Sequence, residues 1–322
     1  MMSQNEQTNY TKLIADTLVN KNKRNLGRFQ DRCIKQALYF SAVYRDFIYK
    51  IIKSPSIKIR DGKTGEGYLQ HSNSERTTLT KSVEKLIVAD IFYPEILPHE
   101  LGHAVDYWFG SQLTLSTTII VRDEKTLHDI FIEEFSSCYE QIHKDVMEEY
   151  KNIINSTINA NAYSIFINNL DTYKKLCDER EPRTRKKLQK ELYENGFMEV
   201  YSQIYFKNCY SMLNLKYGPI LDALSSKYDF DHLFLSHHQP SYYQYTDEYR
   251  PTIEFFANVF RAKVTSQHTH YDNLIKYLPK SFDAFERLFV IIYDHFQNNK
   301  RFTDVSIVEK EIPIFPDDDE EE

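Results

Sequence analysis

Apolar residues recur at helical spacing over most of the chain. Residues 8–53 carry such a stripe, and the basic segment 21–28 interrupts it as an expected turn. Residues 125–154 carry the clearest stripe, and further helices are predicted over 160–177, 184–216, 219–228 and 271–299. The pattern therefore predicts a mainly helical protein.

Residues 54–92 have a different pattern. The segment SPSIKIRDG alternates between apolar and polar residues and ends at the turn-forming pair Asp61-Gly62. Residues 86–92, LIVADIF, are either a strand or the lead-in to the next helix, and residues 303–315 favour one more short strand. The predicted fold class is α+β, mainly α with a small β-sheet.

Composition narrows the class of protein. The 322 residues are 41% hydrophobic and 27% charged, as in globular proteins, and the 24 Tyr and 21 Phe predict an aromatic core. A net charge of −7 argues against a nucleic-acid binder. No run of about 18 apolar residues is present, so no membrane span is expected. The four cysteines lack C-x-x-C spacing and are expected to be reduced thiols, namely Cys33, Cys138, Cys177 and Cys209.

The candidate chemistry is concentrated in residues 99–108, HELGHAVDYW. His99 and His103 are four residues apart, so on a helix both imidazoles can reach one metal ion. Glu100 is then placed to act on a water that the metal activates. The less specific interpretation is a surface helix with two histidines. Pro98 favours a helix start, and Gly102 predicts close approach of another backbone, such as a sheet edge.

Other polar residues are predicted to support or complete this site. Asp106 falls on the histidine face and could accept the second N–H of a ligand imidazole. Glu134 lies within the apolar stripe of 125–154 and is a candidate third ligand, because a carboxylate there needs a partner or a metal. Glu254 enters an aromatic helix that Pro251 opens, and it shares a face with Asn258 and Arg261. His71 is a further candidate ligand, although a lone loop histidine is usually a surface group.

Four segments together resemble the anthrax lethal factor-like family of zinc metallopeptidases. HELGHAVDYW resembles the zinc helix of that family, including Gly102 and Asp106. In the same order, three other segments resemble the following helix, the segment with the third ligand and the closing helix: LHDIFIEE (127–134), YRPTIEFFANVFR (249–261) and LPKSFDAFERLFVII (278–292).

This resemblance implies a zincin-like core and assigns roles to its residues. His99, His103 and Glu254 would bind Zn²⁺, and Glu100 would be the general base. The assignment favours Glu254 over Glu134 as the third ligand. Tyr249 would stabilise the oxyanion, but its spacing to Glu254 is two residues shorter than in the family, so Tyr245 stays open.

The predicted organisation interrupts the catalytic core with an insertion. An N-terminal helical segment covers 1–56, and the two halves of the core cover 57–134 and 236–302. A helical insertion occupies 135–235. Residues 303–322 are expected to add a strand and a disordered acidic tail.

The expected function is a zinc-dependent endopeptidase acting on a protein substrate. The polar N-terminus lacks a conventional signal peptide, and together with the acidic residues 317–322 it fits a bacterial effector or toxin translocated into the host cytosol. A host cytoskeletal or signalling protein, such as actin or a kinase-pathway protein, is the expected target, and a monomer is expected. The alternatives are a non-catalytic interaction module on a degenerate zincin fold and an intracellular bacterial or phage peptidase, which would be cytoplasmic.

Overall fold

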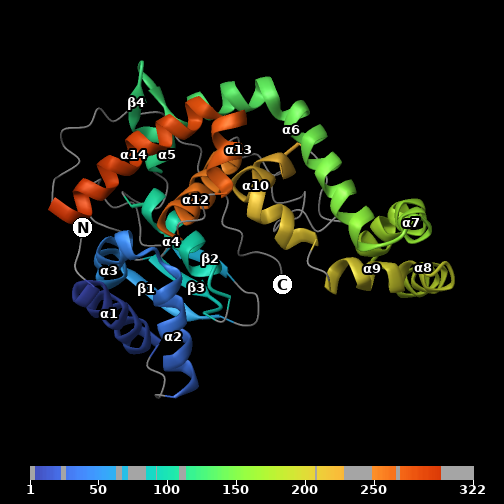
Figure 1. Ribbon diagram of the computed structural model, residues 1–322, viewed down its shortest axis with the longest axis horizontal. Coiled ribbons are helices and arrows are strands. Elements are labelled where there is room, and N and C mark those ends of the chain that lie inside the picture. The colour runs from blue at the N-terminus through green and yellow to red at the C-terminus, as the bar shows by residue number, and fades with distance from the viewer. Residues whose placement is uncertain are drawn as a thin grey trace. The chain divides into compact units, whose positions relative to one another are not determined.

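The computed structural model is mainly helical, with a three-stranded and a two-stranded sheet (Figure 1). It describes residues 4–22, 27–62, 67–71, 85–91, 93–108, 114–206, 209–227, 249–265 and 269–298. The expected strand in 303–315 and the acidic tail lie outside these residues. The predicted mainly helical class with a small sheet is confirmed.

The chain divides into two compact units. The first comprises residues 1–136 and 247–322, and the second comprises residues 137–246. The insertion predicted over 135–235 falls almost entirely within the second unit.

The first unit begins with helices, two of which (the first and the third α-helix) pack on the first strand of the sheet. They are α1 (Gln4–Asn22), α2 (Arg28–Tyr39), the 3-10 turn η1 (Ala42–Tyr44) and α3 (Arg45–Lys53). The chain leaves α1 in the basic segment and resumes helix at Arg28, as the pattern predicts. Helix α1 packs against α2, α3 and strand β1 (Ile57–Asp61).

The three-stranded sheet is mixed, in the order β1-β3-β2. Strand β3 (Lys85–Ala89) runs parallel to β1 and antiparallel to β2 (Gly67–His71). Along β1, buried and exposed side chains alternate, which accounts for the alternating sequence pattern. The first residues of the segment 86–92 therefore form a strand, which precedes helix α4 (Ile96–Asp106).

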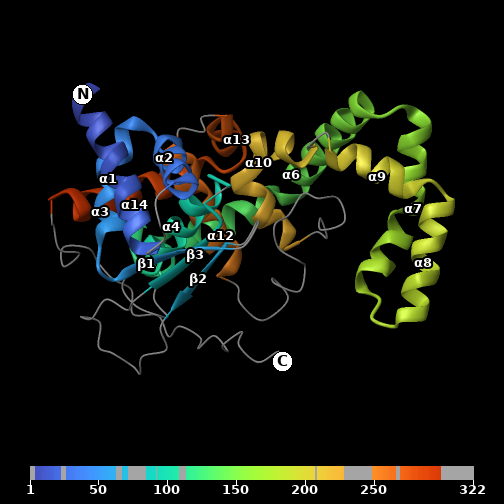
Figure 2. The same cartoon turned by 90° about the horizontal axis from the view of Figure 1, so that it is seen from below.

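Helix α4 (Ile96–Asp106) packs on β2 and β3 and against α12 (Arg250–Thr265). Figure 2 shows this helix pair beside the three strands. Residues from two distant parts of the chain are thereby brought side by side above one sheet.

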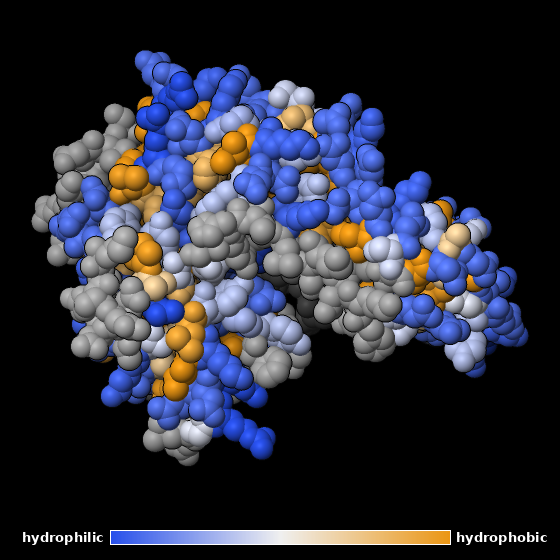
Figure 3. Space-filling model, viewed as in Figure 1, coloured by the Kyte–Doolittle hydropathy of each residue, from blue (hydrophilic) through white to orange (hydrophobic). Residues whose placement is uncertain are grey.

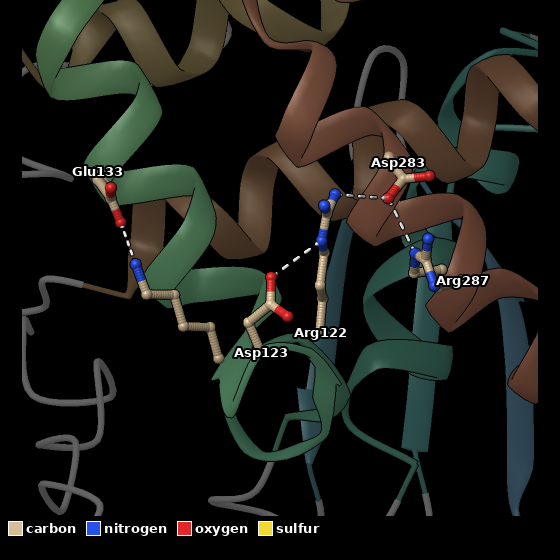
Figure 4. A network of polar contacts seen from close by, with 6 residues as sticks. Arg122, Asp123, Glu133, Asp283 and Arg287 are labelled. Atoms are coloured by element: carbon tan, nitrogen blue, oxygen red, sulfur yellow. Dashed lines mark hydrogen bonds and ion pairs between the residues drawn. The ribbon is translucent and has the colours of Figure 1, made fainter.

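A short hairpin lies between α4 and the long helix α6 (Leu127–Thr157). Helix α5 (Leu115–Thr118) leads into β4 (Ile120–Arg122) and β5 (Lys125–Thr126). Figure 4 shows ion pairs around it: Arg122 lies 3.6 Å from Asp283, which also accepts from Arg287, and Lys125 pairs with Glu133. Because these groups are largely exposed, the pairs orient the hairpin more than they stabilise the fold.

The core of the first unit is aromatic, as the composition predicts. Ring centroids of Phe47, Phe256, Phe285 and Phe289 lie 5.4–6.2 Å from another ring of the cluster, which includes Phe260. The single helix predicted over 271–299 is wrong in one respect. It is two helices, α13 (Thr269–Tyr277) and α14 (Pro279–Asn298), because Pro279 starts a new helix at its first position.

The second unit is helical throughout the part that is described. After α6 it contains α7 (Ala160–Asp178), α8 (Pro182–Glu194), α9 (Phe197–Phe206) and α10 (Cys209–Ser225). The helix predicted over 184–216 breaks at Gly196, whose φ of 73° is left-handed. The helix start predicted at 219 is also wrong, because Pro219 lies inside α10.

The visible surface is predominantly hydrophilic, with scattered apolar patches (Figure 3). Among the described residues, no helix has the length and hydropathy needed to cross a membrane. Cys33, Cys138 and Cys177 are not in disulfide bonds, in agreement with the predicted reduced thiols.

Candidate metal centre

Helix α4 presents the two histidines from consecutive turns. Their imidazole rings are nearly perpendicular, and the Nε2 atoms of His99 and His103 are 3.1 Å apart. The side chain of His99 is 14% exposed and that of His103 is 11% exposed. Both rings are therefore almost enclosed, and each retains a small opening to solvent.

Gly102 allows α12 to approach these histidines closely. A Cβ atom at Gly102 would lie 2.8 Å from Cα of Ala257 and 3.0 Å from its carbonyl oxygen. The predicted approach of another backbone is therefore correct, but that backbone belongs to a helix and not to a sheet edge. Close packing of α4 on α12 offsets the helix-propensity cost of about 1 kcal/mol that glycine has relative to alanine in a helix interior.

This approach places Glu254 between the two imidazoles. Its Oε2 atom is 3.4 Å from Nε2 of His99 and 3.6 Å from Nε2 of His103. Glu254 is fully buried, and a buried carboxylate requires a compensating cation or donors. The three side chains form a group whose ligand atoms lie within 4.8 Å of one another and could hold a metal ion.

The spacing of these three atoms is that of a small tetrahedral metal site. Ligand atoms about 2.0–2.1 Å from a tetrahedral ion lie about 3.3–3.4 Å from each other. The observed separations of 3.1, 3.4 and 3.6 Å scatter around that value. The ligand shell needed for a metal is thus nearly preformed.

The pKa values of the two histidines indicate that only one of the two imidazoles carries a proton near pH 7. Burial lowers the pKa of His99 to about 4, although Glu254 opposes the shift. Burial also acts to lower the pKa of His103, but Glu254, with help from Glu100 and Asp106, raises it to about 9. The group therefore favours one cation beside Glu254, either a proton on His103 or a metal ion.

Glu100 lies next to the group but points toward β2. The residue is only 5% exposed. Its Oε1 atom lies 3.0 Å from where a Cβ atom would stand at Gly67. A second carboxylate, distinct from the three ligand candidates, is therefore held beside the site between α4 and β2.

Asp106 and Asn258 both lie buried near the site and make hydrogen bonds within it. Asp106 accepts hydrogen bonds from the backbone N–H (2.8 Å) and the hydroxyl (2.9 Å) of Ser116. Burial raises the pKa of Asp106 to about 7, against those two bonds. The amide of Asn258 donates to the carbonyl oxygen of Glu254, 3.0 Å away. A hydrogen bond from a ligand imidazole to Asp106 stays a prediction.

Glu134, the rival ligand, has a different role in the structure. Its carboxylate accepts the backbone N–H groups of Lys280 (3.0 Å) and Ser281 (2.7 Å) and the hydroxyl of Ser281 (2.6 Å). It therefore caps the N-terminus of α14. A carboxylate on an apolar helix face needs a polar partner, and for Glu134 that partner is the N-terminus of α14.

Tyr249 lies at the start of α12, packed on a histidine from α6. Its ring centroid is 4.4 Å from that of His128, and the carbonyl of Tyr249 accepts the N–H groups of Thr252 and Ile253. Nδ1 of His128 is 2.8 Å from the hydroxyl of Thr252. The predicted oxyanion role of Tyr249 is not tested by these contacts. Tyr245 and the side chain of His71 lie outside the described residues.

Three residues near the site were not predicted. Ser116 holds Asp106, Gly67 borders Glu100, and His128 packs on Tyr249. A glycine in a predicted strand signals close packing and could have identified Gly67. Ser116 and His128 carry no such local signal, because their contacts depend on how separate elements meet.

Comparison with known proteins adds no assignment to this geometry: no protein-family model, no curated protein and no solved structure matches the chain.

Proposed function

We propose that the chain is a zinc-dependent endopeptidase of the lethal factor-like type. The observation that carries the proposal is the group of His99, His103 and Glu254, with the buried carboxylate of Glu100 beside it. Two imidazole nitrogens and one carboxylate oxygen are a ligand set of catalytic zinc sites, which keep a fourth position open. The separations of 3.1–3.6 Å between the three ligand atoms support an ion of this size.

The donor set fits zinc better than it fits calcium or magnesium, which prefer oxygen ligands. Bound zinc would lower the pKa of a water from about 16 toward 7 and polarise a substrate carbonyl. His99, His103 and Glu254 would hold it, with Gly102 keeping α12 close enough for Glu254 to reach.

The remaining chemistry falls to the protein's own side chains. Glu100 would take a proton from the attacking water and deliver it to the nitrogen of the leaving amine. The hydroxyl of Tyr249 would donate a hydrogen bond to the developing oxyanion. Strand β2 is one of the two edge strands of the described sheet and lies next to Glu100, and an extended peptide could lie along it.

The burial of Glu100 argues against a non-catalytic interaction module. Burying a carboxylate costs free energy, and metal binding by the other three side chains does not need this one. The same site would serve an intracellular peptidase. The proposed role as an effector acting on a host protein rests on the resemblance and the sequence alone, and loss of translocation on deleting residues 313–322 would support it.

The direct test is proteomics of new N-termini. A host-cell extract is treated with zinc-loaded wild-type protein or with Glu100→Ala, and both samples are compared with untreated extract. The proposal expects a small set of new N-termini with the wild type and none of them with the variant. An extract unchanged by the wild type, or the same new termini with both proteins, would contradict it.

A further inference from the structure

The backbone of Gly67 lies directly against two side chains of α4. A Cβ atom built at Gly67 would lie 2.5 Å from Cγ2 of Ile96 and 3.0 Å from Oε1 of Glu100. Gly67 is the first residue of β2 and pairs with Ala89 of β3. The pairing with β3 fixes the backbone of Gly67, and side chains of α4 occupy the space where a Cβ atom at residue 67 would lie.

The two contacts would respond differently to a side chain at residue 67. Cγ2 of Ile96 is attached to the β carbon, and the branched side chain is stiff about its first torsion. Oε1 of Glu100 is at the far end of a longer side chain with three torsions. An added methyl group would therefore move the carboxylate more readily than it would move the helix.

Exposure at the two positions differs as well. Glu100 is only 5% exposed, whereas Gly67 is exposed on the strand. The carboxylate thus rests on the inner side of a strand whose outer side faces solvent. Any side chain at residue 67 that avoids Ile96 and Glu100 would have to distort the first pair of the ladder.

We infer that Gly67 is a positioning residue for the general base, because the absence of a side chain there lets the Glu100 carboxylate rest against the β2 backbone beside the metal group. This inference rests on the proposed peptidase function. Gly67 touches none of the three ligand candidates among the contacts of its Cβ position, so metal binding and base placement are separable.

The test compares Ile96→Ala with the double variant Gly67→Ala/Ile96→Ala. Removing Cγ2 of Ile96 first eliminates the stiffer clash, so the remaining effect of Gly67→Ala acts on Glu100. The inference expects kcat to fall roughly tenfold in the double variant, because the 3.0 Å contact displaces the carboxylate by a few tenths of an ångström and a displacement of about 1 Å costs about 100-fold. KM and the zinc Kd should change by less than about threefold, because neither depends on the base.

A second pair tests whether Gly67→Ala acts through Glu100. Glu100→Asp withdraws the carboxylate from residue 67. Adding Gly67→Ala to Glu100→Asp/Ile96→Ala should therefore change kcat by less than about threefold. A further fall of about tenfold in this background, or a zinc Kd raised more than about tenfold in either pair, would show a general packing role for Gly67 and overturn the inference.

Crystal structures of the zinc-loaded variants provide a readout that is independent of activity. The inference expects the Glu100 carboxylate to be displaced in Gly67→Ala/Ile96→Ala and undisplaced in Ile96→Ala. An unmoved carboxylate, or an unchanged kcat in the double variant, would overturn it. If the wild type cleaves no protein, the proposed function fails, and the structures alone then decide whether Gly67 positions Glu100.

Discussion

At the scale of single residues, the site depends on one buried carboxylate meeting two imidazoles. Residue types and spacing pointed to His99 and His103 as a pair, since a helix brings positions four apart together, whereas the role of Glu100 stays a prediction. They could not decide between Glu134 and Glu254, because each carboxylate lies on an apolar helix face. Only the packing of α12 on α4 separates a metal ligand from a helix cap.

This distinction predicts opposite behaviour for two alanine variants. Glu254→Ala should weaken zinc binding by more than about 100-fold, which is the upper end of the loss caused by removing a hydrogen-bond partner of a ligand. Glu134→Ala should leave zinc binding intact but lower the free energy of unfolding by about 1–3 kcal/mol, because it leaves the N-terminus of α14 without its cap. Zinc competition titrations and denaturant unfolding measure the two effects. The reverse pattern would restore Glu134 as the ligand.

The shifted pKa values predict proton release when zinc binds. The pKa of His103 is raised to about 9, so this imidazole carries a proton at pH 7 before the metal arrives. Since a ligand imidazole must be neutral, zinc displaces about one proton per site at pH 7, and its apparent affinity rises about tenfold per pH unit up to about pH 9.

Calorimetry in buffers of different ionisation enthalpy counts the released protons. A binding enthalpy that is independent of the buffer at pH 7 would contradict the assigned protonation of His103. Glu100→Gln is the matched variant, because it keeps the three ligand candidates but removes one of the charges that raise the pKa of His103, so the proton release should fall.

At the scale of elements, the close crossing of α4 and α12 assembles the site. Pro98 and Pro251 predicted the starts of both helices, and Gly102 indicated that another backbone comes near. Gly102 did not indicate which backbone this is, because a glycine signals a close approach but does not identify the neighbouring element. The predicted sheet was correct in its position before α4, whereas helix ends at Gly196 and Pro279 were missed where apolar stripes continued across a break.

The crossing predicts a coupled loss in Gly102→Ala. A methyl group would lie 2.8 Å from Cα of Ala257, so the helices must separate. The free energy of unfolding should fall by about 1–3 kcal/mol despite the better helix propensity of alanine, and zinc affinity should fall with it. Differential scanning calorimetry with and without zinc measures both changes.

Ala257→Gly provides the control for this variant. The clashing atoms are backbone atoms of residue 257, so removing its side chain should not rescue Gly102→Ala. A Gly102→Ala protein with wild-type stability and zinc affinity would contradict the account of the crossing.

At the scale of the whole molecule, the chain divides into two compact units, and the candidate metal site lies in the discontinuous first unit. The prediction of an insertion over 135–235 rests on the change from segments that resemble the family to a helical run without a recognisable motif. That these residues are an insertion stays a prediction.

The central claim is that Glu100 serves the reaction while three other residues hold the metal. The most direct measurement is the zinc content and cleavage rate of Glu100→Gln, using a protein substrate identified from new N-termini. The account predicts one zinc per chain, an unchanged circular dichroism spectrum and a cleavage rate at least about 100-fold below that of the wild type. A zinc-loaded Glu100→Gln protein that cleaves as fast as the wild type would contradict it.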